Sequence, residues 1–335
     1  MSDPYGVLRA VLDDDQWRRL PRGKRPTWIA PMLATLTEDR FSDERWIFER
    51  KLDGVRAVVV KSGGATRIWS RTHKDMSASY PELVQALDRQ PTQDFVADGE
   101  IVTFDGKQTS FAKLQARIQL TDPVRIARTG VDVYLYLFDL LMLADADLTR
   151  FPLRVRKRVL RQALQFTDPI RYSTHRNREG EKYYRQACER GWEGLIAKRS
   201  DSAYQSKRSR DWLKFKCVRD QEMVVGGFTD PAGSRQGFGA LLVGYYERGK
   251  LRYAGKVGTG YNTRTLQDLR GRMDAMEQER SPFADPVREP GAHWIRPELV
   301  VQVGFTEWTS DGKLRHPRYQ GVRIDKDPRD VIRET

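Results

Sequence analysis

The pattern of apolar and polar positions divides the chain into three regions. Residues 1–30 carry no sustained alternation and include a broken basic stretch at 22–26, so we expect a peripheral basic N-terminal arm, with ordered structure from about residue 29. Residues 31–217 mix strand-like and helix-like patterns, whereas residues 218–335 are mostly typical of short strands. The change near residue 218 predicts a boundary between two domains.

Residues 31–217 combine strand patterns with amphipathic helices. Val55–Lys61 and Ala65–Ser70 are separated by Gly63-Gly64, which predicts a hairpin. Val131–Leu143 is almost continuously apolar, as expected for a buried strand. Amphipathic helices are predicted at residues 81–90, 154–164 and 181–190. We therefore expect an α+β domain built on antiparallel sheets.

Residues 218–335 show a different texture. Glycine-rich turns separate short apolar runs, and one helical pattern is interposed. The runs lie at 224–228, 240–246, 251–257 and 299–308, and the helical pattern spans 263–276. About five short strands with one helix predict an all-β Greek-key barrel of the OB-fold type.

Charge and composition narrow the function. Lys plus Arg number 59 against 46 for Asp plus Glu, a net charge of +13. Such an excess indicates a polyanionic partner, with nucleic acid the strongest candidate, although a soluble protein can also simply be basic. No apolar run approaches the roughly 18 residues of a membrane span, and no secretory h-region opens the chain. The two cysteines are too few for a disulfide framework or a four-cysteine zinc site, so we expect structural, reduced thiols in a cytosolic protein.

Charged and aromatic residues recur at strand ends. In chain order these are Lys51-Leu52-Asp53-Gly54-Val55-Arg56, Ser70-Arg71, Asp98-Gly99-Glu100, Phe138-Asp139, Glu193 to Lys198, Trp212 to Lys216, and Arg323-Ile324-Asp325-Lys326. Lys214 and Lys216 share one strand face, because side chains alternate with period two. Each motif alone also fits a charged turn, ordinary packing or a salt bridge. Their order and spacing together are specific.

This set resembles the covalent nucleotidyltransferase superfamily, and most closely the bacterial ATP-dependent DNA ligases of the ligase D type. The similarity runs from about Pro31 to the end and includes Tyr204-Gln205, Gly255–Gly260 and Leu314–Pro317. It implies an adenylation domain at 31–217 and an OB-fold domain at 218–335. It also implies ATP-dependent sealing of nicks or ends in double-stranded DNA through a lysyl-AMP intermediate, in recombination and double-strand-break repair by non-homologous end joining.

The resemblance also implies roles for single residues. Lys51 is the nucleophile, and a setting among Arg56, Lys198, Lys214 and Lys216 would favour its neutral amine. Phe138 would stack on adenine, or serve only in core packing, while Glu49 would accept a hydrogen bond from the adenine amino group. The remaining nucleotide contacts would be Arg56, Arg71, Glu100, Lys198, Lys214, Lys216, Arg323 and Lys326. Arg323, Asp325 and Lys326 would face pyrophosphate in the first step and then swing away on a hinge at 216–221; Asp325 could equally be a structural salt-bridge partner. Glu100 and Glu193 would hold Mg²⁺ or Mn²⁺, and Glu100 could instead contact ribose.

Contacts to DNA and to other proteins are expected as well. Arg71, Lys207, Arg208 and Arg210 are candidate contacts to DNA phosphates, Arg71 to the 5′ phosphate of the nick. The basic helix at 154–161 has either that role or a solvated face. The family suggests Ku and a separate repair polymerase as partners of a monomer in the bacterial or archaeal cytoplasm, associated with the nucleoid and not with a membrane.

Other functions fit part of the same pattern. An RNA ligase or a capping-type guanylyltransferase would use the same lysine chemistry, and a decayed enzyme could act as a non-catalytic nucleic-acid-binding module. NAD as donor is disfavoured, because no nicotinamide-binding segment precedes residue 46. The choice between a stand-alone ligase and the ligase portion of a longer protein stays open, as does the preference for a 3′ ribonucleotide at the nick.

Overall fold

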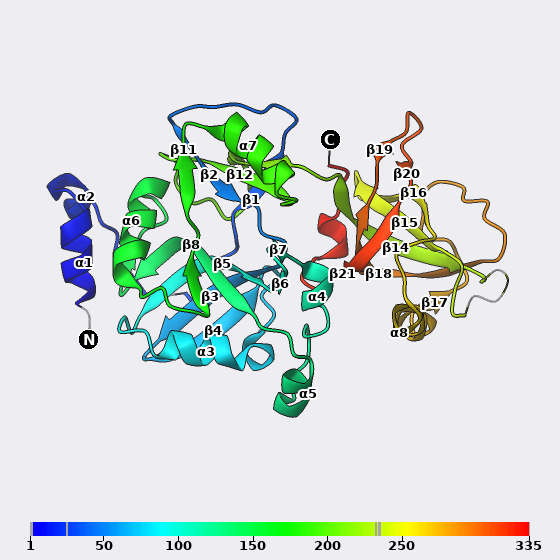
Figure 1. The fold of residues 1–335 in the computed structure, drawn as a ribbon, viewed down its shortest axis with the longest axis horizontal. Helices are drawn as coiled ribbons and strands as arrows, with labels where there is room; N and C mark the ends of the chain where they lie inside the picture. Colours follow the sequence, from blue (N-terminus) through cyan, green and yellow to red (C-terminus); the bar gives the residue numbers. More distant parts are fainter. Residues whose placement is uncertain (1–2, 25, 232, 234–235, 335) are drawn as a thin grey trace. The chain divides into compact units, whose positions relative to one another are not determined.

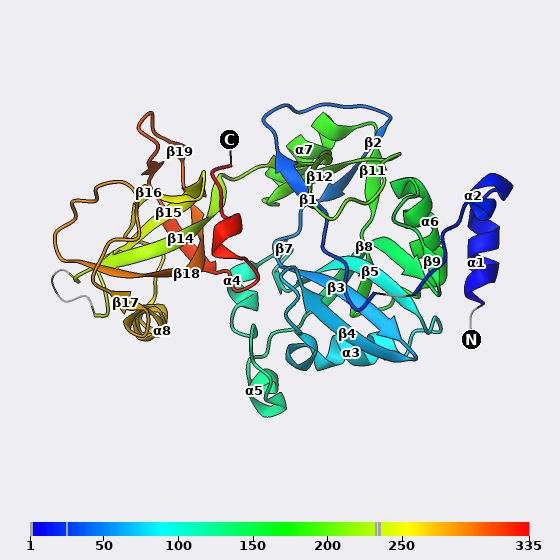
Figure 2. The same cartoon turned by 180° about the vertical axis from the view of Figure 1, so that it is seen from behind.

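The computed structural model describes residues 3–24, 26–231, 233 and 236–334. The chain forms two compact units, unit 1 at residues 1–217 and unit 2 at residues 218–335, shown from two sides in Figures 1 and 2. Among the described residues, no helix has the length and apolar character needed to cross a bilayer.

Unit 1 contains two mainly antiparallel sheets. The first has the strand order β1-β13-β12-β2-β11, with only the β1–β13 pair parallel. Its strands are β1 (Leu33–Leu36), β2 (Trp46–Arg50), β11 (His175–Asn177), β12 (Gly194–Arg199) and β13 (Arg208–Lys216). One face of this sheet packs Phe48, Leu195 and Phe215 against Tyr183 and Ala187. The last two belong to α7 (Gly180–Glu189), so α7 covers the apolar face and leaves the other face for polar residues.

The second sheet of unit 1 has the order β10-β8-β5-β3-β4, and β9 pairs with β8. Its strands are β3 (Val55–Ser62), β4 (Ala65–Ser70), β5 (Phe95–Val102), β8 (Tyr134–Leu143), β9 (Ala146–Asp147) and β10 (Ile170–Tyr172). Leu135 and Leu137 of β8 enter the main core, whereas Phe138 and Leu141 enter a second apolar cluster with Trp212 of β13. Because both faces of β8 are covered, its sequence is almost continuously apolar, and the predicted buried strand is confirmed.

Short helices surround these sheets (Figure 1). They are α1 (Pro4–Val11), α2 (Asp14–Arg18), α3 (Pro81–Asp88), α4 (Phe111–Leu114), α5 (Pro123–Arg128) and α6 (Leu153–Ala163), with a 3-10 turn at Ser77–Ser79 and a small hairpin of β6 (Phe104–Asp105) and β7 (Gln108–Thr109). A second 3-10 turn, Pro328–Asp330, belongs to unit 2. The prediction that ordered structure starts near residue 29 is wrong, because α1 packs on α6 and Leu8 is fully buried. Asp3 caps α1, and Asp13 forms a capping box on α2.

Unit 2 is an antiparallel barrel with one long helix. Its main sheet has the order β16-β15-β14-β18-β17, and β21 pairs with β18. The elements are β14 (Asp220–Thr229), β15 (Leu241–Glu247), β16 (Lys250–Val257), α8 (Thr263–Asp274), β17 (Glu277–Gln278), β18 (Ala292–Gly304), β19 (Glu307–Trp308), β20 (Leu314–Arg315) and β21 (Arg318–Val322). A core that includes Val224, Leu242 and Val301 fills it. The predicted α+β unit followed by an OB-fold unit is confirmed.

Candidate active site

Lys51 directly follows β2 and is fixed by its backbone. Its N–H donates to the Gly194 carbonyl at 2.9 Å, which extends the β2–β12 pairing by one residue. A side chain at Gly54 would place its Cβ 2.2 Å from the Ile101 carbonyl oxygen, so only glycine lets this loop approach β5. Asp53 accepts a hydrogen bond from the Phe111 N–H at 2.9 Å. The Asp-Gly of the motif therefore anchors the loop that presents Lys51.

The Lys51 amine forms an ion pair with Glu193 Oε1. Glu193 Oε2 is buried and, within the part of the chain that the structure describes, has no hydrogen-bond partner. Gly194 holds φ at +143° with its Cβ position 1.9 Å from the Phe215 carbonyl oxygen, a conformation that requires glycine. Glu193 directly precedes β12, and the constrained backbone of Gly194 fixes its position. The sequence predicted that only cations would surround Lys51, whereas the structure places the Glu193 carboxylate directly beside its amine.

The polar face of the first sheet gathers the expected cations. Ile196 of β12 pairs with Glu49 on one side and with Lys214 on the other, and Lys198 pairs with Trp212. Gly194 pairs with Lys216. Side chains two residues apart share a face, so Glu49, Lys198, Lys214 and Lys216 all lie opposite the face that α7 covers.

The second sheet contributes Arg56 and Glu100, which are directly paired across β3 and β5. Arg56 binds the buried Asp98 carboxylate through two hydrogen bonds of 2.6 Å. Tyr204 also donates to Asp98, at 2.6 Å. Burial opposes the charge of Arg56, but Asp98 outweighs it and the pKa of Arg56 is raised. Arg56 is therefore a permanent, rigidly held cation.

Phe138 lies where the two sheets meet. The Lys198 amine is 4.0 Å and the Arg56 guanidinium carbon 4.8 Å from its ring centroid. The Trp212 ring is 6.1 Å away in an edge-to-face arrangement. Phe138 is 8% exposed and packs in a core cluster with Trp212. Stacking on a base at this ring remains a prediction.

Glu49 lies in a buried ion cluster with two lysines. Lys157 of α6 donates to Oε1 at 2.5 Å, and Lys198 donates to Oε2 at 2.7 Å. Burial raises the pKa of Glu49, but the two ammonium groups outweigh it and the net shift is downward. Burial lowers the pKa of Lys198 to about 8. Sequence reasoning missed Lys157; its position between Leu153 and Leu160 on the apolar stripe of α6 was the signal for a buried lysine.

The basic helix α6 divides its cations between two faces. Arg156 is fully buried and binds Asp139 through two hydrogen bonds of 2.8 Å. Arg154, Arg158 and Arg161 are exposed. A solvated or DNA-facing role therefore applies only to the exposed three, because Arg156 and Lys157 face the core.

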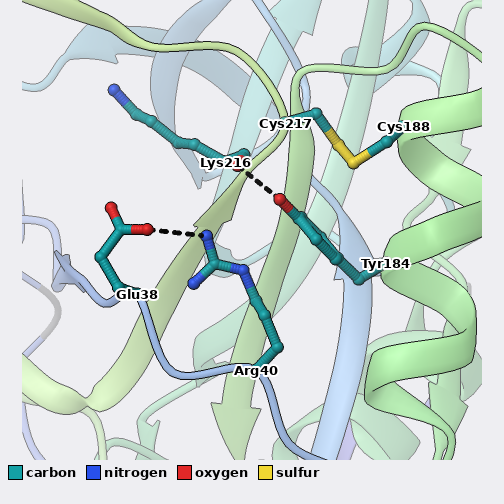
Figure 3. The surroundings of a disulfide bond; sticks show 6 residues. All are labelled: Glu38, Arg40, Tyr184, Cys188, Lys216 and Cys217. Atoms are coloured by element: carbon teal, nitrogen blue, oxygen red, sulfur yellow. Dashed lines mark hydrogen bonds and ion pairs between the residues drawn. A yellow bond between two sulfur atoms is a disulfide. The ribbon is translucent and has the colours of Figure 1, made fainter. Parts of the chain in front are cut away.

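The prediction of two reduced cysteines is wrong. Cys188 of α7 and Cys217, at the end of β13, form a disulfide (Figure 3). The Tyr184 hydroxyl donates to the Lys216 carbonyl at 2.9 Å, a second link from α7 to this strand end. The Lys216 side chain points away from the disulfide in Figure 3. Nearby, Arg40 and Glu38 form an ion pair of 3.6 Å. Because the cysteines are 29 residues apart, sequence alone did not reveal their proximity.

The candidate DNA contacts lie at the surface of unit 1. Arg71, just after β4, is partly exposed. Lys207, Arg208 and Arg210 are exposed around the start of β13, and Arg208 donates to the Ala34 carbonyl at 2.7 Å. Their side chains can reach a polyanion, and the DNA role stays a prediction.

In unit 2 the candidate residues follow β21. Arg323 donates to Asp325 at 3.0 and 2.8 Å, so Asp325 is the salt-bridge partner that one of the two interpretations expected. Lys326 forms an ion pair of 2.7 Å with Glu222 of β14.

The two predicted metal ligands come from different sheets. Glu100 lies on β5 opposite Arg56, and Glu193 precedes β12. No cluster of three or more His, Cys, Asp or Glu ligands occurs among the described residues. Magnesium needs only one or two carboxylates and keeps several waters. The unpartnered Glu193 oxygen fits such a ligand.

The fold and the lysine-centred site define a nucleotidyltransferase of the ligase type. Residues 31–216 match the model of the ATP dependent DNA ligase domain, and residues 234–326 match that of the ATP dependent DNA ligase C terminal region. The chain belongs to the family of ATP-dependent DNA ligases, which confirms the resemblance inferred from its motifs.

Several known proteins are similar to this chain over most of its length. A multifunctional non-homologous end joining protein LigD of Pseudomonas aeruginosa is 37% identical over 318 residues, covering 92% of this chain and 37% of that protein. The LigD of Mycobacterium bovis is 36% identical over 350 residues, covering 100% of this chain and 44% of that protein. The chain thus spans less than half the length of these curated relatives. A solved structure of mycobacterial DNA ligase D complexed with ATP and MES has a TM-score of 0.64 and 34% identity, covering 91% of this chain and 98% of that one.

Proposed function

We propose that the protein seals nicks or ends in double-stranded DNA with ATP, through AMP bound to Lys51. The observation that carries this proposal is the fixed lysine itself. Its backbone is hydrogen-bonded to Gly194, its amine is paired with Glu193, and it follows a sheet face that gathers Lys198, Lys214 and Lys216.

In the first step the Lys51 amine attacks the α-phosphorus of ATP. A nitrogen–phosphorus bond forms, and the bond from that phosphorus to the pyrophosphate oxygen breaks. The amine must lose a proton to attack, and in this proposal Glu193 Oε1, its ion-pair partner, accepts that proton. Lys214 and Lys216 stabilise the negative charge that spreads over the phosphate oxygens. Arg323 and Lys326 of unit 2 are the proposed pyrophosphate contacts.

Phe138, Glu49 and Arg56 form the proposed nucleoside site, and Glu100 contacts either ribose or the metal. A magnesium or manganese ion held by Glu193 and Glu100 would supply Lewis-acid stabilisation of the phosphates.

In the second step an oxygen of the DNA 5′ phosphate attacks the AMP phosphorus and releases Lys51. In the third, the 3′ hydroxyl attacks the activated 5′ phosphorus, the new phosphodiester bond forms and AMP leaves. Arg71 is the proposed contact to the 5′ phosphate, and Lys207, Arg208 and Arg210 bind the DNA backbone.

The names of the LigD relatives support a place in non-homologous end joining. Ku and a separate repair polymerase are the proposed partners of a monomeric ligase in the cytoplasm, close to the nucleoid.

Intact mass after incubation with ATP and magnesium tests the proposal, with NAD and GTP run alongside. Gain of one AMP from ATP alone, followed by sealing of nicked DNA, is the expected result. An adduct from GTP would favour the capping-type alternative. No adduct from any donor, together with tight binding to nicked DNA, would favour the non-catalytic binding module.

A further inference from the structure

We propose that Lys157 is a positioning residue for recognition of the donor base, because it fixes the Glu49 carboxylate relative to Phe138. The inference rests on the proposed function, which assigns both residues to the adenine site. Lys157 itself touches neither the reacting atoms nor, by this assignment, the nucleotide.

The Lys157 side chain is 2% exposed and donates three hydrogen bonds. The acceptors are Glu49 Oε1 at 2.5 Å, the Ser173 carbonyl at 3.0 Å and the Phe138 carbonyl at 3.3 Å. An ammonium group has three protons to donate, so each has an acceptor. A buried ammonium group is costly unless all its protons are hydrogen-bonded. The same three hydrogen bonds also fix the positions of the three acceptors.

These acceptors belong to both sheets of unit 1. Glu49 lies on β2 of the first sheet, Phe138 lies on β8 of the second, and Ser173 lies in the link from β10 to β11. One buried amine therefore joins the sheets where the proposed hydrogen-bond acceptor for the base meets the proposed stacking ring. Its loss would change the spacing between the two groups.

The contacts of the buried Glu49 carboxylate leave one acceptor position unused. Oε1 accepts from Lys157, and Oε2 accepts from Lys198 at 2.7 Å and from the Ser173 hydroxyl at 3.3 Å. A carboxylate offers about four acceptor positions, so one is left for an amino group. With two ammonium partners the carboxylate stays ionised and can only accept. An acceptor selects the 6-amino group of adenine and repels a carbonyl at that position.

The test measures formation of the AMP-type adduct against concentration for ATP, inosine triphosphate and purine riboside triphosphate, in wild type and in Lys157→Met. These analogues carry a carbonyl or a hydrogen where ATP has its amino group. We expect the preference for ATP in kcat/KM to fall about ten- to hundredfold in the variant, the worth of a hydrogen bond to a charged group. The loss should appear mainly in KM, since the reacting atoms are untouched.

Lys61→Met is the matched control. Lys61 is also fully buried on unit 1, and its amine donates to the Asp88 and Gln90 carbonyls at 3.0 and 2.8 Å. The Lys61→Met variant should be less stable than wild type but should keep its preference for ATP. An unchanged preference in Lys157→Met, or an equal loss in the Lys61 control, would overturn the positioning role.

A second variant covers the case in which Lys157→Met does not fold. Lys157→Met combined with Glu49→Gln removes one positive and one negative charge from the cluster and leaves Lys198. If Lys157 acts through Glu49, the double variant should discriminate no worse than Glu49→Gln alone, whereas multiplied losses would contradict the assignment. A wild-type protein that forms no adduct with any nucleotide would instead overturn the proposed function, and this assignment with it.

Discussion

The two units hold their candidate residues in different ways. In unit 1 the charged groups are tied by contacts between distant segments: Glu49 binds Lys157 and Lys198, which are more than 100 residues away in sequence. In unit 2 Arg323 binds Asp325 only two residues on, whereas Lys326 of the same motif pairs with Glu222 on the distant strand β14. Unit 1 therefore prearranges its site through buried contacts between distant segments, whereas the candidate segment of unit 2 holds Arg323 locally and Lys326 by one partly exposed ion pair. Such a segment can change its contacts without loss of the core.

The largest expected effect is at Lys51. Lys51→Ala should abolish formation of the AMP adduct, because the attacking nitrogen is lost. Lys51→Arg is the matched variant: it keeps the positive charge but cannot act as the neutral nucleophile, so it should be equally inactive. Intact mass and binding to nicked DNA are the measurements. Adduct in either variant would move the nucleophile to another residue, while lost DNA binding in both would indicate a folding defect.

The next largest effect is on stability, and it compares a buried with an exposed arginine of α6 in unit 1. Arg156→Met should cost about 3 to 5 kcal/mol in the free energy of unfolding, because it leaves Asp139 charged and buried. Arg158→Met, on the exposed face of the same helix, should cost less than about 0.5 kcal/mol. Urea denaturation compares the two.

A combined change tests the cause. Arg156→Met with Asp139→Leu should recover much of the loss, since no unpaired charge remains. If the Arg156 and Arg158 variants are equally stable, burial does not determine how much an arginine of α6 contributes to stability.

The disulfide of unit 1 gives the third effect. Cys188→Ser opens a loop with a sequence separation of 29 and should lower the free energy of unfolding by about 3.5 kcal/mol, chiefly by freeing the unfolded chain. Wild type under a thiol reductant should lose the same amount, and the reduced variant should lose nothing more. The measurement is thermal unfolding, with and without reductant. Thiols that can be alkylated without prior reduction would contradict the bond.

These differences also explain what could be predicted from sequence. Local signals sufficed for the Gly63-Gly64 hairpin between β3 and β4, for the buried strand β8 and for α8. The charged motifs led to Lys51 and Glu193, which the fold brings into contact. Contacts across long sequence separations escaped: Lys157 with Glu49, and Cys188 with Cys217. Pairing of distant segments depends on tertiary packing, which no local pattern encodes.

The smallest effect tests unit 2 directly. Lys326→Ala breaks a partly exposed ion pair with Glu222, so the free energy of unfolding should change by less than about 1 kcal/mol. Adenylylation should nonetheless slow about 100-fold, the usual cost of losing one charge-stabilising group in a transition state, while sealing of a pre-adenylylated nick should change little. Single-turnover assays of the two steps measure both rates.

Glu222→Gln breaks the same ion pair and is the matched control for Lys326→Ala. It keeps the lysine, so its adenylylation rate should stay near that of wild type even though its stability changes by a similar amount. If Lys326→Ala and Glu222→Gln slow adenylylation equally, the ion pair itself matters and the pyrophosphate role is wrong. If Lys326→Ala slows both chemical steps equally, Lys326 acts throughout the reaction. Lys326 of unit 2 would then be as permanent a part of the site as the buried cations of unit 1.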